Sequence, residues 1–255
     1  VQTCALPISY ETKIKDIMET NVISVTTHED KEDVAQMFSK YDLSALPVVD
    51  GENRLVGIIT FDDAMDVMEE EATEDMEIMA AMTPSEKSYL KSSPFELYKH
   101  RIPWLMLLMV SATFTGMIIS SFESALTKLA ALTAFIPMLM GTGGNSGAQA
   151  STAVIRSLSL GDTEPKDAFR VMWKEWRVAA ICGITLAAVN FVKMLLLDGM
   201  LLHNDSVTIA VAATVSVSIV FIVMFAKVVG SMLPIIAEKV GVDPAVMANP
   251  LISSV

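Results

Sequence analysis

The feature that most constrains this chain is a run of 27 residues without a charged side chain, between Lys128 and Arg156. As a helix, the run is long enough to cross the hydrocarbon core of a bilayer, about 30 Å thick. Its middle, from Gly141 to Gln149, nevertheless reads Gly-Thr-Gly-Gly-Asn-Ser-Gly-Ala-Gln, which is glycine, amide and hydroxyl rather than leucine. Lipid cannot satisfy such groups, so they must face protein or water. The run is therefore the first candidate for a solute pathway.

Further apolar stretches accompany this run. Residues 102–122 and 206–226 carry no charge, and residues 178–197 carry only Lys193. Another stretch begins near Pro244 and reaches Val255 after 12 residues, which is short of the roughly 20 that a full crossing needs. We therefore expect an α-helical membrane domain over residues 102–255, with four spans and a truncated fifth.

The charge of the chain is divided unevenly. Residues 1–101 hold 9 Lys and Arg against 21 Asp and Glu, a net charge of −12, whereas residues 102–255 hold nine of each. This acidity argues against a nucleic-acid partner and for cations. Basic residues flanking the apolar stretches predict a multi-pass protein of the cell membrane with its acidic N-terminal domain in the cytoplasm. They are Lys99, Arg101, Arg156, Lys166, Arg170, Lys174, Arg177, Lys227 and Lys239.

The glycine-rich run allows two interpretations. Gly143 and Gly147 form a small-xxx-small pair, which lets membrane helices approach closely. Packing alone does not require the amides of Asn145 and Gln149, which favour a pathway. Pro137 is expected to kink the helix and expose carbonyl oxygens.

The segment Gly141-Thr-Gly-Gly-Asn-Ser-Gly-Ala-Gln149, with Asp243-Pro-Ala and Asn249-Pro-Leu251 further on, resembles the signature of MgtE-type magnesium transporters. The resemblance covers nearly everything from about residue 12 to residue 255. It implies a homodimeric, five-span, channel-like Mg²⁺ transporter with cytoplasmic sensing domains, bound to membrane lipid, and no enzyme.

Mg²⁺ keeps its water shell, so its pathway needs neutral oxygens that hydrogen-bond that shell. The resemblance places the pathway along the second and fifth spans and its main ion-binding aspartate two residues beyond Val255. The expected pathway residues are Gly141, Thr142, Gly144, Asn145, Asn249 and Ser253. Asp243 and Glu123 are metal candidates; the alternatives are a helix N-cap for Asp243 and a solvated loop carboxylate for Glu123.

Residues 10–80 look like a single CBS domain with an acidic C-terminal helix, whereas residues 1–9 resemble a translated sequencing adapter and are left out of the fold. A helix is expected around residues 34–38, and strands over 46–50 and 55–60. In CBS domains that bind ATP, residues at the positions of Thr60 and Asp63 contact the ribose.

Residues 62–77 contain nine carboxylates and no basic residue. Like charges four residues apart destabilise a helix by about 0.2–0.5 kcal/mol per pair, so something should offset them. The carboxylates could simply be solvated in a linker. Alternatively, a divalent cation could bridge them and offset their repulsion. By resemblance, Asp63, Asp66, Glu71, Glu74 and Asp75 bind regulatory Mg²⁺. A connecting helix over residues 81–101, starting at Thr83-Pro84, would carry the signal to the pore.

Four alternatives compete with this prediction. An intramembrane metalloprotease lacks its His-Glu-x-x-His motif here, and an anion channel does not suit an acidic vestibule. The same fold could carry Mn²⁺, Co²⁺ or Ni²⁺, although oxygen ligands disfavour the softer metals. The chain as given could also be a non-conducting piece.

Overall fold

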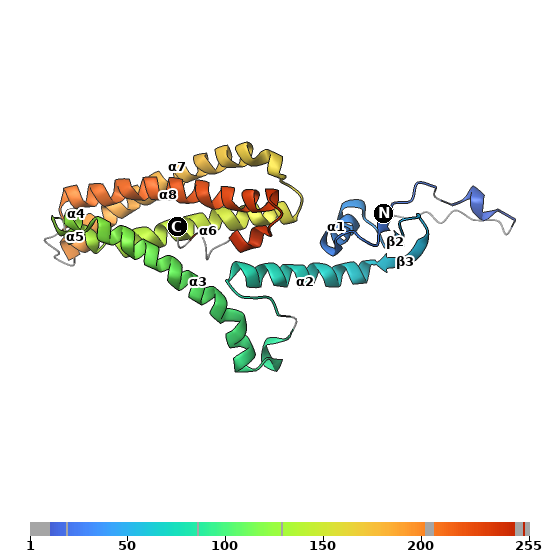
Figure 1. Ribbon diagram of the computed structural model, residues 1–255. Coiled ribbons are helices and arrows are strands. Elements are labelled where there is room, and N and C mark those ends of the chain that lie inside the picture. Colours follow the sequence, from blue (N-terminus) through green and yellow to red (C-terminus); the bar gives the residue numbers. More distant parts are fainter. Residues whose placement is uncertain are drawn as a thin grey trace. The chain divides into compact units, whose positions relative to one another are not determined.

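The computed structural model describes residues 11–18, 20–85, 87–128, 130–201, 207–247 and 252. The chain divides into two compact units, Val1–Glu71 and Ala72–Val255, and the division falls inside one long helix, α2 (Figure 1).

The first unit contains a three-stranded sheet and one covering helix. The strands are β1 (Val25–Thr26), β2 (Ala45–Val49) and β3 (Leu55–Thr60), in the order β1-β2-β3. β1 and β2 are parallel, and β2 and β3 are antiparallel. Helix α1 (Lys31–Tyr41) connects β1 to β2, and a 3-10 turn spans Ile14–Asp16. The helix and both strands expected from the sequence are confirmed.

The core of this unit lies between α1 and the sheet. Its buried side chains are Val25, Val34, Ala35, Phe38, Leu46 and Ala64. Asp30 caps α1 by accepting a hydrogen bond from the Glu32 backbone amide, and Asp42 ends the helix in the left-handed region at φ 52°. The outer strand β3 is largely exposed among the described residues of this unit.

Helix α2 (Phe61–Met79) begins directly after β3. It contains the acidic run, and Ala64 is its one fully buried residue. The carboxylates of Asp62 and Asp63 lie in its first turn, where the helix dipole favours negative charge.

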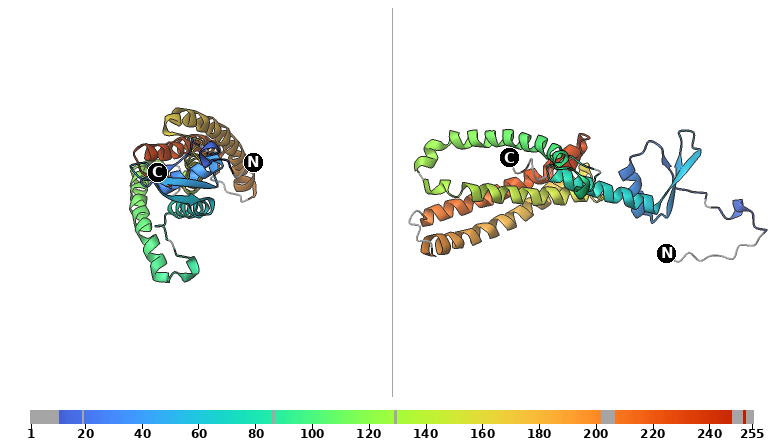
Figure 2. Two further views of the ribbon diagram at one scale, coloured as in Figure 1. Left: turned by 90° about the vertical axis from the view of Figure 1, so that its right-hand side faces the viewer. Right: turned by 90° about the horizontal axis from the view of Figure 1, so that it is seen from below.

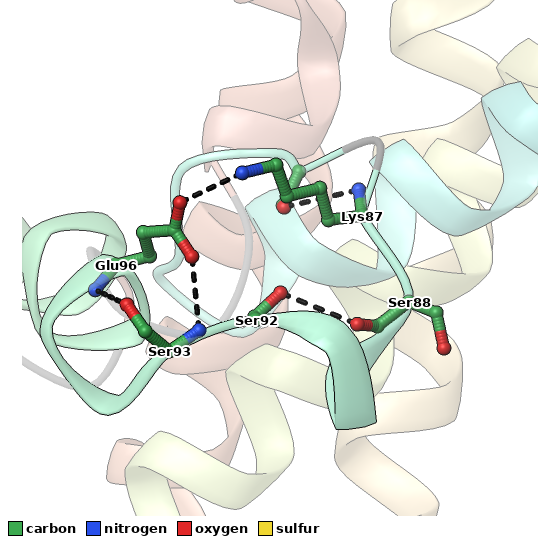
Figure 3. Close-up of polar contacts among 6 residues, drawn as sticks. Lys87, Ser88, Ser92, Ser93 and Glu96 are labelled. Carbon is green, nitrogen blue, oxygen red and sulfur yellow. Dashed lines mark hydrogen bonds and ion pairs between the residues drawn. The ribbon is translucent and has the colours of Figure 1, made fainter.

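After the end of α2, the second unit continues with the connection to α3 (Pro94–Ser121). The sequence predicts a connecting helix from Pro84, but residues 82–85 form a loop, a 3-10 turn spans Tyr89–Lys91, and α3 starts at Pro94. Ser93 explains this start. Its hydroxyl accepts from the Glu96 backbone amide while the Glu96 carboxylate accepts from the Ser93 amide, and Lys87 pairs with Glu96 at 2.7 Å (Figure 3).

Three long helices form the body of the second unit. They are α6 (Ile136–Ser159), α7 (Ala168–Lys193) and α8 (Ile209–Lys239), which lie side by side with α8 against both others (Figure 2). Short helices α4 (Glu123–Lys128) and α5 (Ala130–Thr133) precede α6. A π-helical stretch, Met194–Leu201, follows α7, and 3-10 turns span Pro165–Asp167 and Pro244–Met247.

Within the part of the chain that the structure describes, three helical segments are long and apolar enough to cross a membrane: Pro94–Ser121, Pro165–Leu201 and Ile209–Lys239. The polar residues of α6 keep it out of this group, although it has 24 residues. The expected fifth span falls largely on residues outside the described part.

Two expectations about individual residues are wrong. Pro137 lies in the first turn of α6, where its missing amide hydrogen breaks no helical hydrogen bond, so it does not kink the helix. Lys227, expected in a loop, is buried within α8, which continues 13 residues beyond the predicted span, from 226 to 239. No described residue forms an ion pair with it.

Candidate ion pathway and acidic helix

One face of α6 packs against α8. A Cβ added at Gly143 would come within 2.8 Å of the Ile222 side chain, and one added at Gly147 would overlap Ile252. Gly230 of α8 lies directly against the backbone of Gly147. The packing interpretation of the small-xxx-small pair therefore applies to this face, where only glycine permits the close approach.

The opposite face of α6 is polar and exposed in the protomer. Gly141, Asn145, Gln149 and Thr152 follow one another at helical spacing and all are exposed. Neither amide side chain has a hydrogen-bond partner within the described part of the chain. The run thus has two faces, one that packs and one whose amide side chains find no hydrogen-bond partner among the described residues.

The remaining pathway candidates on α6 lie between these faces. Thr142 is half-buried, and its hydroxyl donates to the Met138 carbonyl at 2.8 Å, which leaves its oxygen lone pairs free to accept. Gly144 is also half-buried. The polar face therefore presents amide and hydroxyl oxygens that can hydrogen-bond the water shell of a hydrated cation.

The candidates outside α6 are placed less completely. Asn249 and Ser253 lie outside the described residues. Asp243 accepts a hydrogen bond from the Ala245 amide at 2.7 Å and so caps the turn Pro244–Met247, as its alternative interpretation requires. Glu123 is the exposed first residue of α4. A metal role for either carboxylate stays a prediction.

The acidic residues of α2 do not form a complete metal site. Asp63, Asp66 and Glu74 are exposed, while Glu71 and Asp75 are half-buried. Among the described residues, no group of three or more His, Cys, Asp or Glu side chains could hold a metal ion. Further ligands from outside the described chain would be needed to complete one.

Part of the repulsion on α2 is offset by a lysine of α1. The Lys31 ammonium lies 2.8 Å from a Glu71 carboxylate oxygen and 3.9 Å from one of Glu70. Sequence reasoning missed this partner, because nothing local connects residues 40 positions apart. Glu71, a predicted metal ligand, already has a cation beside it.

The predicted nucleotide residues meet at the junction of β3 and α2. Asp63 accepts hydrogen bonds from the Thr60 hydroxyl at 2.6 Å and from the Thr60 amide at 3.2 Å. Hydrogen bonding from the Thr60 side chain is also the largest reason that the pKa of Asp62 lies below its ordinary value, with help from nearby backbone amides. These bonds fix the start of α2, and ribose binding stays a prediction.

Comparisons with known proteins match both units. Residues 136–255 match the model of the MgtE family, described as divalent cation transporters, and residues 14–70 match the CBS domain model. The magnesium transporter MgtE of Thermus thermophilus is 40% identical over 243 residues, which is 95% of this chain and 52% of that protein. MgtE of Bacillus subtilis is 36% identical over 252 residues, 96% of this chain and 52% of that protein.

A solved structure, described as the soluble part of a magnesium transporter, is 49% identical and covers 24% of each chain with a TM-score of 0.24. The chain spans about half the length of the curated relatives it matches.

These matches define a class of protein, a CBS domain followed by a membrane transport domain. The matches confirm the resemblance of this chain to the family of MgtE divalent cation transporters. The predicted fold class, an α/β CBS domain before an α-helical membrane domain, is confirmed as well. Because the family and these relatives are transporters, the expectation that the chain is no enzyme also holds.

Proposed function

We propose that the protein containing this chain carries Mg²⁺ across a cell membrane along the polar face of α6. The observation that supports this most is that Asn145 and Gln149 are exposed and have no hydrogen-bond partner among the residues that the structure describes. Unpaired amides are expensive in lipid, so this face requires water or a second protein surface. A homodimer would provide both, with two α6 helices lining one aqueous route.

The family description and the names of the relatives support the cargo. A pathway of neutral oxygens suits a cation that keeps its hydration shell. The same donors disfavour Co²⁺ and Ni²⁺ and discriminate weakly against Mn²⁺, which is the alternative cargo.

The pathway is tested by comparing two asparagine substitutions, each made separately in the full-length protein. Asn145→Leu removes an amide from the exposed face of α6, and we expect Mg²⁺ uptake into proteoliposomes to fall at least about tenfold. Asn190→Leu is the matched control, because Asn190 is buried between α7 and α8 and donates to Ser216 at 3.1 Å. The control should lower thermal stability and keep the uptake rate. Equal uptake by wild type and Asn145→Leu would refute the pathway, and Mn²⁺ competition would identify the cargo.

We further propose that cytoplasmic Mg²⁺ closes this transporter by binding α2. Carboxylates three and four residues apart repel one another, and a divalent cation shared with ligands of another chain would offset that repulsion. Bound ions would draw two subunits together and favour the closed state, whereas low Mg²⁺ would let them separate. Asp63, Asp66, Glu71, Glu74 and Asp75 are the proposed ligands, with ATP at Thr60 and Asp63 as a second proposed effector.

The gating proposal is tested by neutralising Asp66, Glu70, Glu71, Glu74 and Asp75 together. Single-channel recordings of the full-length protein should then show no inhibition by internal Mg²⁺. Asp33→Asn is the control, because Asp33 is an exposed carboxylate of α1. This substitution should leave the Mg²⁺ inhibition curve unchanged. Inhibition that survives the five substitutions unchanged would end this proposal while leaving the transport proposal standing.

A further inference from the structure

Two membrane helices begin with the same arrangement of rings and a cation. In α3, the rings of Phe95 and Tyr98 stack with centroids 5.9 Å apart, and the Lys99 ammonium lies 5.0 Å from the Phe95 centroid. We call these three residues the α3 cluster. The spacing is aromatic at i and i+3, and cation at i+4.

The α7 cluster repeats this spacing with Trp173, Trp176 and Arg177. Its indole rings stack with centroids 5.4 Å apart, and the Arg177 guanidinium lies 6.0 Å from the Trp173 centroid. The Arg177 side chain also donates to the Trp173 carbonyl at 3.4 Å. Each cation is therefore held over a ring on the outer surface of its helix.

The rings of both clusters are exposed and belong to neither of the buried apolar clusters formed by the described residues. Phe95 is 64% exposed and Trp173 is 51% exposed, and the second ring of each pair is exposed as well. Large rings left in water cost free energy, so their exposure indicates a surrounding that the isolated protomer lacks.

The position of the clusters identifies that surrounding. On α7, exposed apolar side chains follow directly, with Ile181 and Ile184 on the outer surface. On α3, Leu105 and Met106 follow in the same way. Both helices run toward α4 and α5 in Figure 1, so both clusters lie at the other end of the unit. Aromatic rings at the edge of an apolar helix surface mark the boundary between hydrocarbon and headgroups.

The charges near the α7 cluster favour an anionic partner. Arg170, Lys174 and Arg177 form an exposed stripe at i, i+4 and i+7 beside the aromatic stripe. Arg170 pairs with Asp167 at 3.1 Å, whereas Lys174 has no ion-pair partner among the described residues. Lys174 and Arg177 can therefore bind a phosphate, and the stripe is about 10 Å long, comparable to a headgroup layer.

We propose that the α3 and α7 clusters bind the phosphate groups of anionic phospholipids in one leaflet, with Lys174 as a second ligand at the α7 cluster. The cations contact the headgroups, and the rings lie at the level of the lipid glycerol. The inference rests on the membrane placement in the proposed function, and it is independent of which ion is carried. It assigns phosphatidylglycerol-type lipid, rather than another protein, to this surface.

The test uses tryptophan fluorescence of the full chain in lipid vesicles. Trp104 is replaced by phenylalanine, so that the signal comes from Trp173 and Trp176. Brominated phosphatidylglycerol and brominated phosphatidylcholine are mixed in fixed ratios, and quenching gives their relative binding constant at the α7 cluster. We expect a preference for the anionic lipid that falls roughly fivefold in each of Lys174→Gln and Arg177→Gln. Lys239→Gln, an exposed lysine at the end of α8, is the matched control and should change nothing.

Each outcome decides the proposal. Equal quenching by the two lipids in the wild type would refute it, as would a preference unchanged in both glutamine variants. Rings that neither lipid quenches would show that protein covers the surface. Lys174 is exposed, so its variant should fold, and circular dichroism checks this. Arg177→Lys should keep most of the preference by keeping the charge. Because no ion flux is measured, these outcomes do not depend on transport.

Discussion

Gly141 and Gly147 stand six residues apart on α6 and face opposite surroundings. A Cβ at Gly147 would overlap Ile252 and come within 3.1 Å of the Ala226 carbonyl oxygen, whereas one at Gly141 would meet nothing within 4 Å. Packing therefore requires glycine at position 147, whereas at position 141 the surrounding space would admit a larger side chain.

We predict that Gly147→Ala destabilises the membrane unit and that Gly141→Ala does not. Overpacking at Gly147 should cost about 1–3 kcal/mol, because the obstacle includes a backbone carbonyl that cannot move aside. Thermal unfolding of the purified protein, followed by circular dichroism, measures both variants under the same conditions. Equal melting temperatures for the two would contradict the close packing of α6 on α8.

At the scale of an element, the start of α3 depends on the hydrogen bonds of Ser93 and Glu96. Ser88, five residues earlier, precedes a 3-10 turn, and its hydroxyl makes no capping hydrogen bond to that turn. We predict that Ser93→Ala costs about 0.5–2 kcal/mol of stability and frays the first turn of α3. Ser88→Ala is the matched control and should have little effect. Hydrogen exchange of the backbone amides of residues 95–97 would show the difference directly.

The sequence predicts the existence of these elements better than their ends. Stretches with at most one charged residue identify α3, α7 and α8, because lipid tolerates few charges. Lys227 misled the prediction of where α8 ends, since a buried lysine inside an apolar helix cannot be told from a lysine that ends it. Pro137 misled in the same way, because a proline starts a helix or kinks one according to its distance from the helix end.

At the scale of the whole molecule, the polar face of α6 should meet water and not lipid. We predict that Asn145→Cys, with Cys4 and Cys182 replaced by serine, reacts with a charged water-soluble thiol reagent in vesicles. Ala150→Cys, on the buried face, should react at least about tenfold more slowly. Millimolar Mg²⁺ should protect only Cys at position 145. A reaction rate at this position as low as at position 150 would place the pathway elsewhere.

The candidate site was only partly predictable at this scale. Residues of α6 could be named from their sequence, because their polarity conflicts with an apolar surrounding. Which of them pack and which are exposed depends on α8, whose Ile222 lies 79 residues after its neighbour Gly143, and no local pattern contains that information. The ion pair of Lys31 with Glu71 was unpredictable for the same reason, since it joins two helices between which β2 and β3 lie in the sequence.

The division of α6 into two faces limits which substitutions the helix can accept during evolution. On one side, any increase in volume pushes two helices apart; on the other, any loss of polarity removes a group that solvent or cargo uses. Beyond the α3 cluster, the outer surface of α3 bears neither demand, since any apolar side chain there serves equally well. Related chains should therefore diverge fastest along α3 and slowest along α6, with tolerated changes in α6 confined to the narrow borders between its two sides.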